Sequence, residues 1–170
     1  MIAIRKILVA TDFGEAAESA LGYGRDLAAR FGATVYVLHV AENVSVSAFG
    51  AETYAAFAPD LQRELEESAH RRLADAVVDS DDSGPQTVPV VMTSSSPAFA
   101  IIDYAREHEI DLIIMGTHGR GALGHFLMGS VAERVVRLAG CPVLTIRRPE
   151  RDVEHPDALA AVRTTATVLA

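Results

Sequence analysis

The sequence predicts an α/β fold: an open, five-stranded parallel sheet in the strand order 3-2-1-4-5, with helices on both faces. Five short apolar runs alternate with four longer segments whose apolar residues recur at helical spacing, which is typical of a parallel sheet. Pro89 lies within the third run, and because proline removes a backbone donor, that strand belongs at a sheet edge. Right-handed crossovers restrict the remaining topologies, and this order places the first and fourth strands side by side.

The first strand is predicted over residues 6–12 and the first helix over residues 15–31. The strand is apolar on both faces, as a central parallel strand should be, and it ends in the polar pair Thr11-Asp12. Asp12 is either the N-cap of the helix or a ligand contact at the end of the strand, and both interpretations stay open. The predicted inward face of the helix consists of Ala17, Ala20, Leu21, Gly24, Leu27, Ala28 and Phe31.

Two features of these early elements have structural interpretations. Gly22-Tyr-Gly24 lies inside the first helix, where it indicates close packing rather than a nucleotide-binding loop. The second strand is predicted over residues 34–40, which are rich in β-branched and aromatic side chains. His39 within it is interpreted as a buried histidine with its hydrogen bonds satisfied, because no second histidine stands at metal-ligand spacing.

The remaining elements follow in order after a long connection over residues 42–58. They are a helix over 60–78, a strand over 87–92, a helix with Ser96 as N-cap and Pro97 at its first position, a strand over 111–115, a helix over 131–139 and a strand over 142–146. The predicted inward residues are Leu61, Leu65, Ala69, Leu73 and Ala76 in the second helix, Ala98, Ile101, Ile102 and Ala105 in the third, and Val131, Val135 and Leu138 in the fourth.

A glycine-bearing loop joins the fourth strand to the fourth helix, with Gly116, Gly119, Gly129 and Ser130 at its marked positions. Glycines let a backbone approach a ligand closely, and the free N–H groups at a helix start attract an anion, so the loop is a candidate phosphate site. The structural alternative is that the two leading glycines are turn residues and that Ser130 forms a capping box with Glu133. In the predicted strand order the loop faces Asp12 across the switch point of the sheet, and this convergence favours phosphate binding.

Composition excludes several classes of protein. A length of 170 residues suits one domain, and a net charge of −8 argues against a general nucleic-acid surface or an anionic membrane as partner. No apolar run approaches the roughly 20 residues that span a bilayer. The single cysteine, Cys141, excludes an intrachain disulfide and a multi-cysteine metal site. Without a recognisable signal peptide, the expected location is the cytoplasm.

With these motifs, the chain resembles the universal stress protein family over about residues 5–147. The resemblance rests on residues 6–12, on His39-Val40, and on the spacing Gly116-x2-Gly119-x9-Gly129-Ser130, which marks the ATP-binding branch of the family. It implies a Rossmann-like fold of the adenine nucleotide alpha hydrolase type, formed by a domain over residues 1–148. The tail over 149–170 exceeds the usual family core and is expected to be disordered or docked on a dimer.

The resemblance also implies ligands and residue roles. It implies ATP with Mg²⁺, and a homodimer formed through the fifth strands. Thr11 and Asp12 would lie near the ribose and phosphates, with Asp12 reaching the Mg²⁺ ion, while Val40 and Met115 would line the adenine pocket. Phosphates would be surrounded by Gly116, Gly119, Gly129, Ser130 and Val131, and the predicted binding set is completed by Arg120 and by Ala10, where many ATP-binding members have proline.

The function expected from this reasoning is an ATP-binding regulatory protein of the stress response, a dimer whose nucleotide state a protein partner would read. One alternative is a slow ATPase or nucleotidyl transferase, for which Asp12 and His118 are the candidate bases. Another is a structural stress dimer that binds no nucleotide. Residues 119–124 form a GxGxxG sequence, but the next strand ends without the acidic residue of a dinucleotide site, and no Walker lysine pattern is present.

Overall fold

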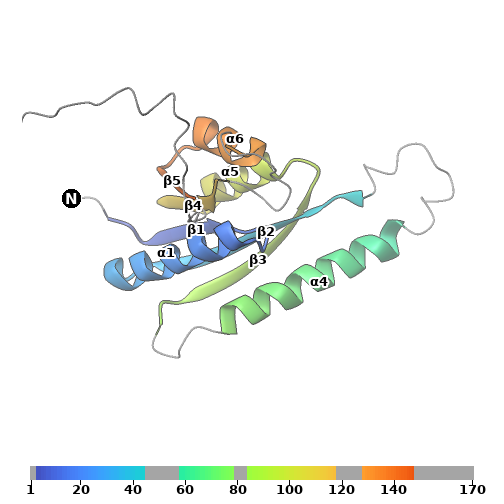
Figure 1. Ribbon diagram of the computed structural model, residues 1–170, viewed down its shortest axis with the longest axis horizontal. Coiled ribbons are helices and arrows are strands. Elements are labelled where there is room, and N and C mark those ends of the chain that lie inside the picture. Colours follow the sequence, from blue (N-terminus) through green and yellow to red (C-terminus); the bar gives the residue numbers. More distant parts are fainter. Residues whose placement is uncertain (1–2, 45–57, 79–83, 118–127, 148–170) are drawn as a thin grey trace, which may run out of the picture.

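The computed structural model describes residues 3–44, 58–78, 84–117 and 128–147, and Figure 1 shows its arrangement. Its strands form one parallel five-stranded sheet in the order β3-β2-β1-β4-β5. The predicted fold class and strand order are therefore confirmed, and Pro89 lies in an edge strand, as expected.

Each predicted element within the described residues forms, with its ends displaced by no more than one or two residues. The strands are β1 (Lys6–Ala10), β2 (Thr34–Glu42), β3 (Thr87–Ser94), β4 (Leu112–Gly116) and β5 (Val143–Ile146). The helices are α1 (Glu15–Phe31), α4 (Ala58–Val78), α5 (Pro97–Glu107) and α6 (Ser130–Leu138).

The sheet is covered on both faces, as Figure 1 shows. Side chains alternate along β1, so Ile7 and Val9 enter one apolar cluster while Leu8 and Ala10 enter the other. Helices α1 and α4 contribute Ala20, Leu21, Ala28 and Leu73 to the first cluster. Helices α5 and α6 contribute Ala98, Ile101, Tyr104, Ala105, Ala132 and Val135 to the second.

The predicted inward faces of the helices were too long. Phe31, Leu61, Leu65 and Leu138 are 50%, 45%, 38% and 53% exposed, so their predicted burial is wrong. Phe31 and Leu138 are the last residues of α1 and α6, whereas in α4 the polar Gln62 and Glu66, which bond Thr93 of β3, take the inward positions beside Leu61 and Leu65. Periodicity gives the direction of a side chain and contains no information about where the neighbouring element stops.

Close packing fixes α1 on the sheet. A Cβ placed on Gly24 would lie 2.6 Å from Cγ2 of Val9, whereas one placed on Gly22 would meet nothing within 4 Å. The close-packing interpretation is confirmed for Gly24. It holds the middle of α1 directly against β1.

Several predictions fall on parts of the chain that lie outside the described residues. These are most of the 42–58 connection, the tail over 149–170, and the loop residues His118, Gly119 and Arg120. Within the described ranges, no helix combines the length and the apolar character needed to cross a membrane.

Candidate functional site

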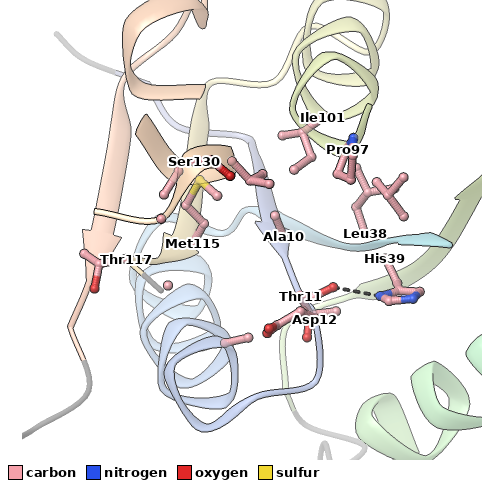
Figure 2. A pocket seen from close by; sticks show the side chains of 16 residues that line it. Ala10, Thr11, Asp12, Leu38, His39, Pro97, Ile101, Met115, Thr117 and Ser130 are labelled. Carbon is pink, nitrogen blue, oxygen red and sulfur yellow. Dashed lines mark hydrogen bonds between the residues drawn. The ribbon is translucent and has the colours of Figure 1, made fainter. Parts of the chain in front are cut away.

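A cavity of about 490 Å³ opens at the carboxyl ends of β1 and β4, the switch point of the sheet (Figure 2). Ligands of open α/β sheets bind at this point because the crossovers on either side of it leave in opposite directions. The lining residues are Ala10, Thr11, Asp12, Ala17, Leu38, His39, Val40, Pro97, Ile101, Met115, Gly116, Thr117, Gly129, Ser130, Val131 and Ala132.

The cavity brings together every predicted site residue that the structure describes. These are Ala10, Thr11, Asp12, Val40, Met115, Gly116, Gly129, Ser130 and Val131, whereas Gly119 and Arg120 lie outside the described residues. The fold therefore brings these residues, which come from distant parts of the sequence, to one cavity.

One wall of the cavity is apolar. Leu38 and Val40 come from β2, Ile101 from α5 and Met115 from β4, and Pro97 stands at the start of α5. Leu38 and Met115 are buried, with 1% and 5% of their surfaces exposed. This wall suits a flat apolar group rather than a charged one, because burying a charge without a partner is costly.

The opposite wall contains a short turn, residues 11–14, in which side chains hold the backbone. Oγ1 of Thr11 accepts the N–H of Phe13 at 2.9 Å, and Oδ1 of Asp12 accepts the N–H of Gly14 at 3.0 Å. Gly14, not Asp12, is the N-cap of α1, so the N-cap interpretation of Asp12 is wrong. Its carboxylate instead forms a local turn and also lines the cavity.

His39 of β2 holds the same turn through a hydrogen bond. Its Nδ1 lies 2.9 Å from the carbonyl oxygen of Thr11, a bond that Figure 2 draws as a dashed line. A carbonyl only accepts, so Nδ1 carries the proton. His39 is half-buried rather than buried and lines the cavity, while the hydrogen bond expected of it is made. Among the described residues, His39 joins no group of three His, Cys, Asp or Glu side chains that could hold a metal.

Helix α6 begins at the cavity without a side-chain cap. Gly129 is the N-cap, and in the described part of the chain no side chain forms a hydrogen bond there. The capping box is therefore wrong: Ser130 is the first helical residue, and the Glu133 carboxylate lies 2.8 Å from Arg137 instead. Ser130 is exposed and lines the cavity, and the first N–H groups of the helix have no partners within it.

Backbone hydrogen bonds fix where α6 starts. The N–H of Gly129 donates to the Thr117 carbonyl at 2.8 Å, and the N–H of Thr117 donates to the Ile146 carbonyl at 2.9 Å. The two ends of the loop are thus tied together and to β5. Thr117 is 9% exposed and is held at the end of β4. These two hydrogen bonds hold the α6 start beside the end of β4, at the cavity.

The described side chains that line the cavity include few charged groups. Among the described lining residues, Asp12 is the one carboxylate and His39 the one imidazole, and neither lysine nor arginine is present. Positive potential therefore comes from the start of α6, where the helix dipole is equivalent to roughly +0.5 charge. An anion would be favoured beside Ser130 and disfavoured beside Asp12 unless a cation bridged the two.

Some lining residues were not predicted. Pro97 and Ile101 could have been found, because a helix that follows β3 begins at the same edge of the sheet as the ends of β1 and β4. Thr117 adjoins a predicted glycine, and Leu38 adjoins His39. Ala17 and Ala132 are small helical residues whose sequence context carries no signal of a cavity.

Comparison with known proteins gives concordant matches. The model of the universal stress protein family matches residues 3–147. Universal stress protein MJ0531 of Methanocaldococcus jannaschii is 30% identical over 148 residues, which are 87% of this chain and 85% of that relative. The solved structure of hypothetical protein MJ0577 has a TM-score of 0.75 at 29% identity, covering 89% of this chain and 100% of that one. That of an Archaeoglobus fulgidus universal stress protein in complex with dAMP has a TM-score of 0.54 at 21% identity, covering 86% and 99%. The chain belongs to the universal stress protein family.

Proposed function

We propose that the protein binds ATP with Mg²⁺ in this cavity and acts as a nucleotide-dependent, dimeric regulatory module of the stress response. The observation that carries the proposal is the start of α6, which no described side chain caps and which meets the cavity opposite Asp12 and beside an apolar wall. Together these features offer an apolar place for a base, N–H donors for phosphates and one carboxylate for a cation. The proposed module is the domain over residues 1–148.

The adenine would occupy the apolar wall. A volume of about 490 Å³ falls in the range of small-molecule sites, roughly 300–1,000 Å³. Val40 and Met115, with Leu38 and Ile101, present apolar surface to both sides of a flat ring. A relative of the same fold is described in complex with dAMP, an adenine nucleotide, which supports this choice of base.

The phosphates would lie at the start of α6. Ser130 supplies a hydroxyl there, and the neighbouring N–H groups point along the helix axis toward the cavity. Gly129 has φ −60° and ψ 146°, a conformation open to any residue, so positive φ does not explain its presence. Space for a ligand that approaches the backbone closely is a physical reason for a glycine at this position.

The residues that line the cavity suit a Mg²⁺ ion only when phosphates are bound beside it. Proteins hold Mg²⁺ with one or two carboxylates plus phosphate oxygens and water, and the described lining supplies Asp12 alone. A carboxylate has lone pairs for several partners, so Asp12 can accept the N–H of Gly14 and also face a cation. When bound, the ion would neutralise phosphate charge that Asp12 would otherwise repel.

Calorimetry on nucleotide-stripped protein tests the proposal. ATP with Mg²⁺ should bind with micromolar affinity or better, and Mg²⁺ without nucleotide should give no heat, because one carboxylate is too weak a site. ATP in excess EDTA should bind more weakly than ATP with Mg²⁺. An absence of heat and of any thermal shift at millimolar ATP would contradict the proposal and leave a nucleotide-free structural dimer.

Slow ATP hydrolysis is a second candidate function. With Nδ1 of His39 committed to the Thr11 carbonyl, its Nε2 is the nitrogen with a lone pair, and the ring lines the cavity. Such a nitrogen can accept a proton from water. If the protein is an enzyme, His39→Gln should abolish turnover in an hour-long assay while ATP affinity persists. Turnover that survives this change would point to another base.

The proposed dimer uses the outer edge of β5. This strand ends the described sheet, with Val143, Leu144 and Thr145 partly buried, and an unpaired edge invites another strand. Leu144→Lys should yield monomers in light scattering, because a charge at an apolar edge opposes pairing. A dimer that persists in this variant would place the interface elsewhere.

A further inference from the structure

The turn that carries Thr11 and Asp12 contains an unusual backbone. Phe13 has φ +62°, in the left-handed region that a bulky residue rarely adopts. Such a conformation persists only where the surroundings determine it. Two of those surroundings are already described: its N–H is held by Thr11 Oγ1, and its ring joins the apolar cluster beneath α1.

The Phe13 ring also has two partners from elements distant in sequence. The His39 ring of β2 lies 4.4 Å from it between centroids, tilted by 38°. The Arg72 guanidinium of α4 lies over its face, 4.0 Å from the centroid. A cation this close to an aromatic face is attracted by the ring quadrupole. Arg72 does not line the cavity, so its contact with the site runs through Phe13.

We propose that Arg72 is a positioning residue for the nucleotide site: through the Phe13 ring it holds the 11–14 turn in the form that presents Asp12 and Thr11 to the ligand. The inference rests on the proposed function. With Arg72 in this role, α4 influences the ATP affinity of the site, although it contributes no residue to the described lining of the cavity.

The contacts support a mechanical role rather than a general electrostatic one. The ring anchors Phe13, which lies between the two hydrogen bonds of the turn. The Thr11 hydroxyl accepts the N–H of Phe13 itself, and the Asp12 carboxylate accepts the N–H of Gly14, the next residue. His39 holds the Thr11 carbonyl and contacts the same ring. Releasing the ring would therefore loosen the position of the Asp12 carboxylate relative to β1.

Arg71 is a matched control on the same helix. It is the adjacent residue, carries the same charge, and lies 3.9 Å from Glu67 with 68% of its side chain exposed. Arg71→Gln and Arg72→Gln remove the same charge from neighbouring positions. Any long-range attraction of ATP should fall equally in both, so a difference between them isolates the contact with Phe13.

The test is a set of calorimetric ATP–Mg²⁺ affinities, with thermal midpoints measured without ATP. Arg72→Gln should weaken ATP binding about two- to fivefold, the size of an exposed cation–π contact, and Arg71→Gln should leave it unchanged. Phe13→Tyr keeps the ring and should bind as the wild type does. Phe13→Gly removes the ring but suits positive φ, so it should fold and bind more weakly.

The double variant decides whether Arg72 acts through the ring. In the Phe13→Gly background, Arg72→Gln should have no further effect on ATP affinity. Equal effects of Arg72→Gln in both backgrounds, or equal effects of Arg71→Gln and Arg72→Gln, would overturn the inference while leaving ATP binding intact. A wild type that binds no ATP would overturn the proposed function, and the inference with it.

Discussion

Two turns face each other across the cavity, and they use their polar side chains differently. In the turn after β1, Thr11 and Asp12 bind the backbone of their own turn, and His39 holds the Thr11 carbonyl. At the start of α6, by contrast, none of the described side chains caps the helix, although Ser130 stands beside it. The backbone of the first turn is thus held by protein side chains, whereas among the described residues no side chain satisfies the first donors of α6.

The two turns differ in whether their hydroxyl group supports the fold or faces a ligand. Both turns contain a hydroxyl residue, Thr11 in one and Ser130 in the other, so residue type alone does not distinguish them. Their hydrogen bonds do: the Thr11 hydroxyl is bonded to its own turn and contributes to folding, whereas the Ser130 hydroxyl makes no capping bond in the described structure and can serve a ligand. Removing the Ser130 hydroxyl should therefore mainly alter ATP affinity, and removing the Thr11 hydroxyl should mainly alter stability.

Ser130→Asp should have the largest effect. Two unit charges 4 Å apart repel by about 4 kcal/mol at an effective dielectric constant of 20, which is roughly a thousandfold in the dissociation constant of ATP. The fold should hold, because aspartate in the first turn of a helix suits the dipole. Calorimetry would measure the affinity, and thermal unfolding without ATP would measure the stability.

Ser130→Ala is the control for this prediction. It should weaken ATP binding about ten- to a hundredfold, the value of roughly 1.5–3 kcal/mol for a hydrogen bond to a charged group. Because the described structure gives Ser130 no capping bond, its stability without ATP should remain within about 0.5 kcal/mol of wild type. If instead Ser130→Asp bound ATP as wild type does, the phosphates would not lie at this helix start.

Gly129→Ala should have the next largest effect, about tenfold on ATP affinity. Its φ of −60° is accessible to alanine, so the change adds no backbone strain. A methyl group forced into a packed contact costs about 1–3 kcal/mol, and here the contact would be with the ligand. The prediction is that the thermal midpoint without ATP stays constant while the ATP-induced shift shrinks. A loss of stability without ATP would instead assign Gly129 a folding role.

The sequence was sufficient for the architecture and for most of the cavity, for identifiable reasons. Alternating element types and Pro89 determined the strand order, and the order brought Asp12 and Gly116 to one edge. The spacing of apolar residues could not show which of them contact a neighbouring strand or helix. Leu61 was predicted to be inward because of its spacing, although α4 buries only its later turns, Ala69 and Leu73 among them.

Hydrogen-bond partners were the other unpredictable feature. Ser130 and Glu133 have the spacing of a capping box, yet Glu133 pairs with Arg137, a partner four residues on that the same sequence also offers. The left-handed Phe13 could not be foreseen either, because no glycine or asparagine marks the position. Two of the partners of its ring, His39 of β2 and Arg72 of α4, are remote in sequence.

Thr11→Val should have the smallest effect on ATP and a clear effect on folding. Valine matches threonine in shape but cannot accept the N–H of Phe13, and leaving a half-buried donor unpaired costs about 1 kcal/mol or somewhat more. For a chain of this size, that lowers the thermal midpoint by roughly 2–4 °C. ATP affinity should change less than in Ser130→Ala, because the Thr11 carbonyl and N–H keep their bonds to His39 and Leu38. Thr11→Ser retains the acceptor and should restore most of the lost stability. A Thr11→Val protein that unfolds like wild type but binds ATP a hundredfold more weakly would contradict this prediction: the Thr11 hydroxyl would then be a ligand contact rather than a support of the turn.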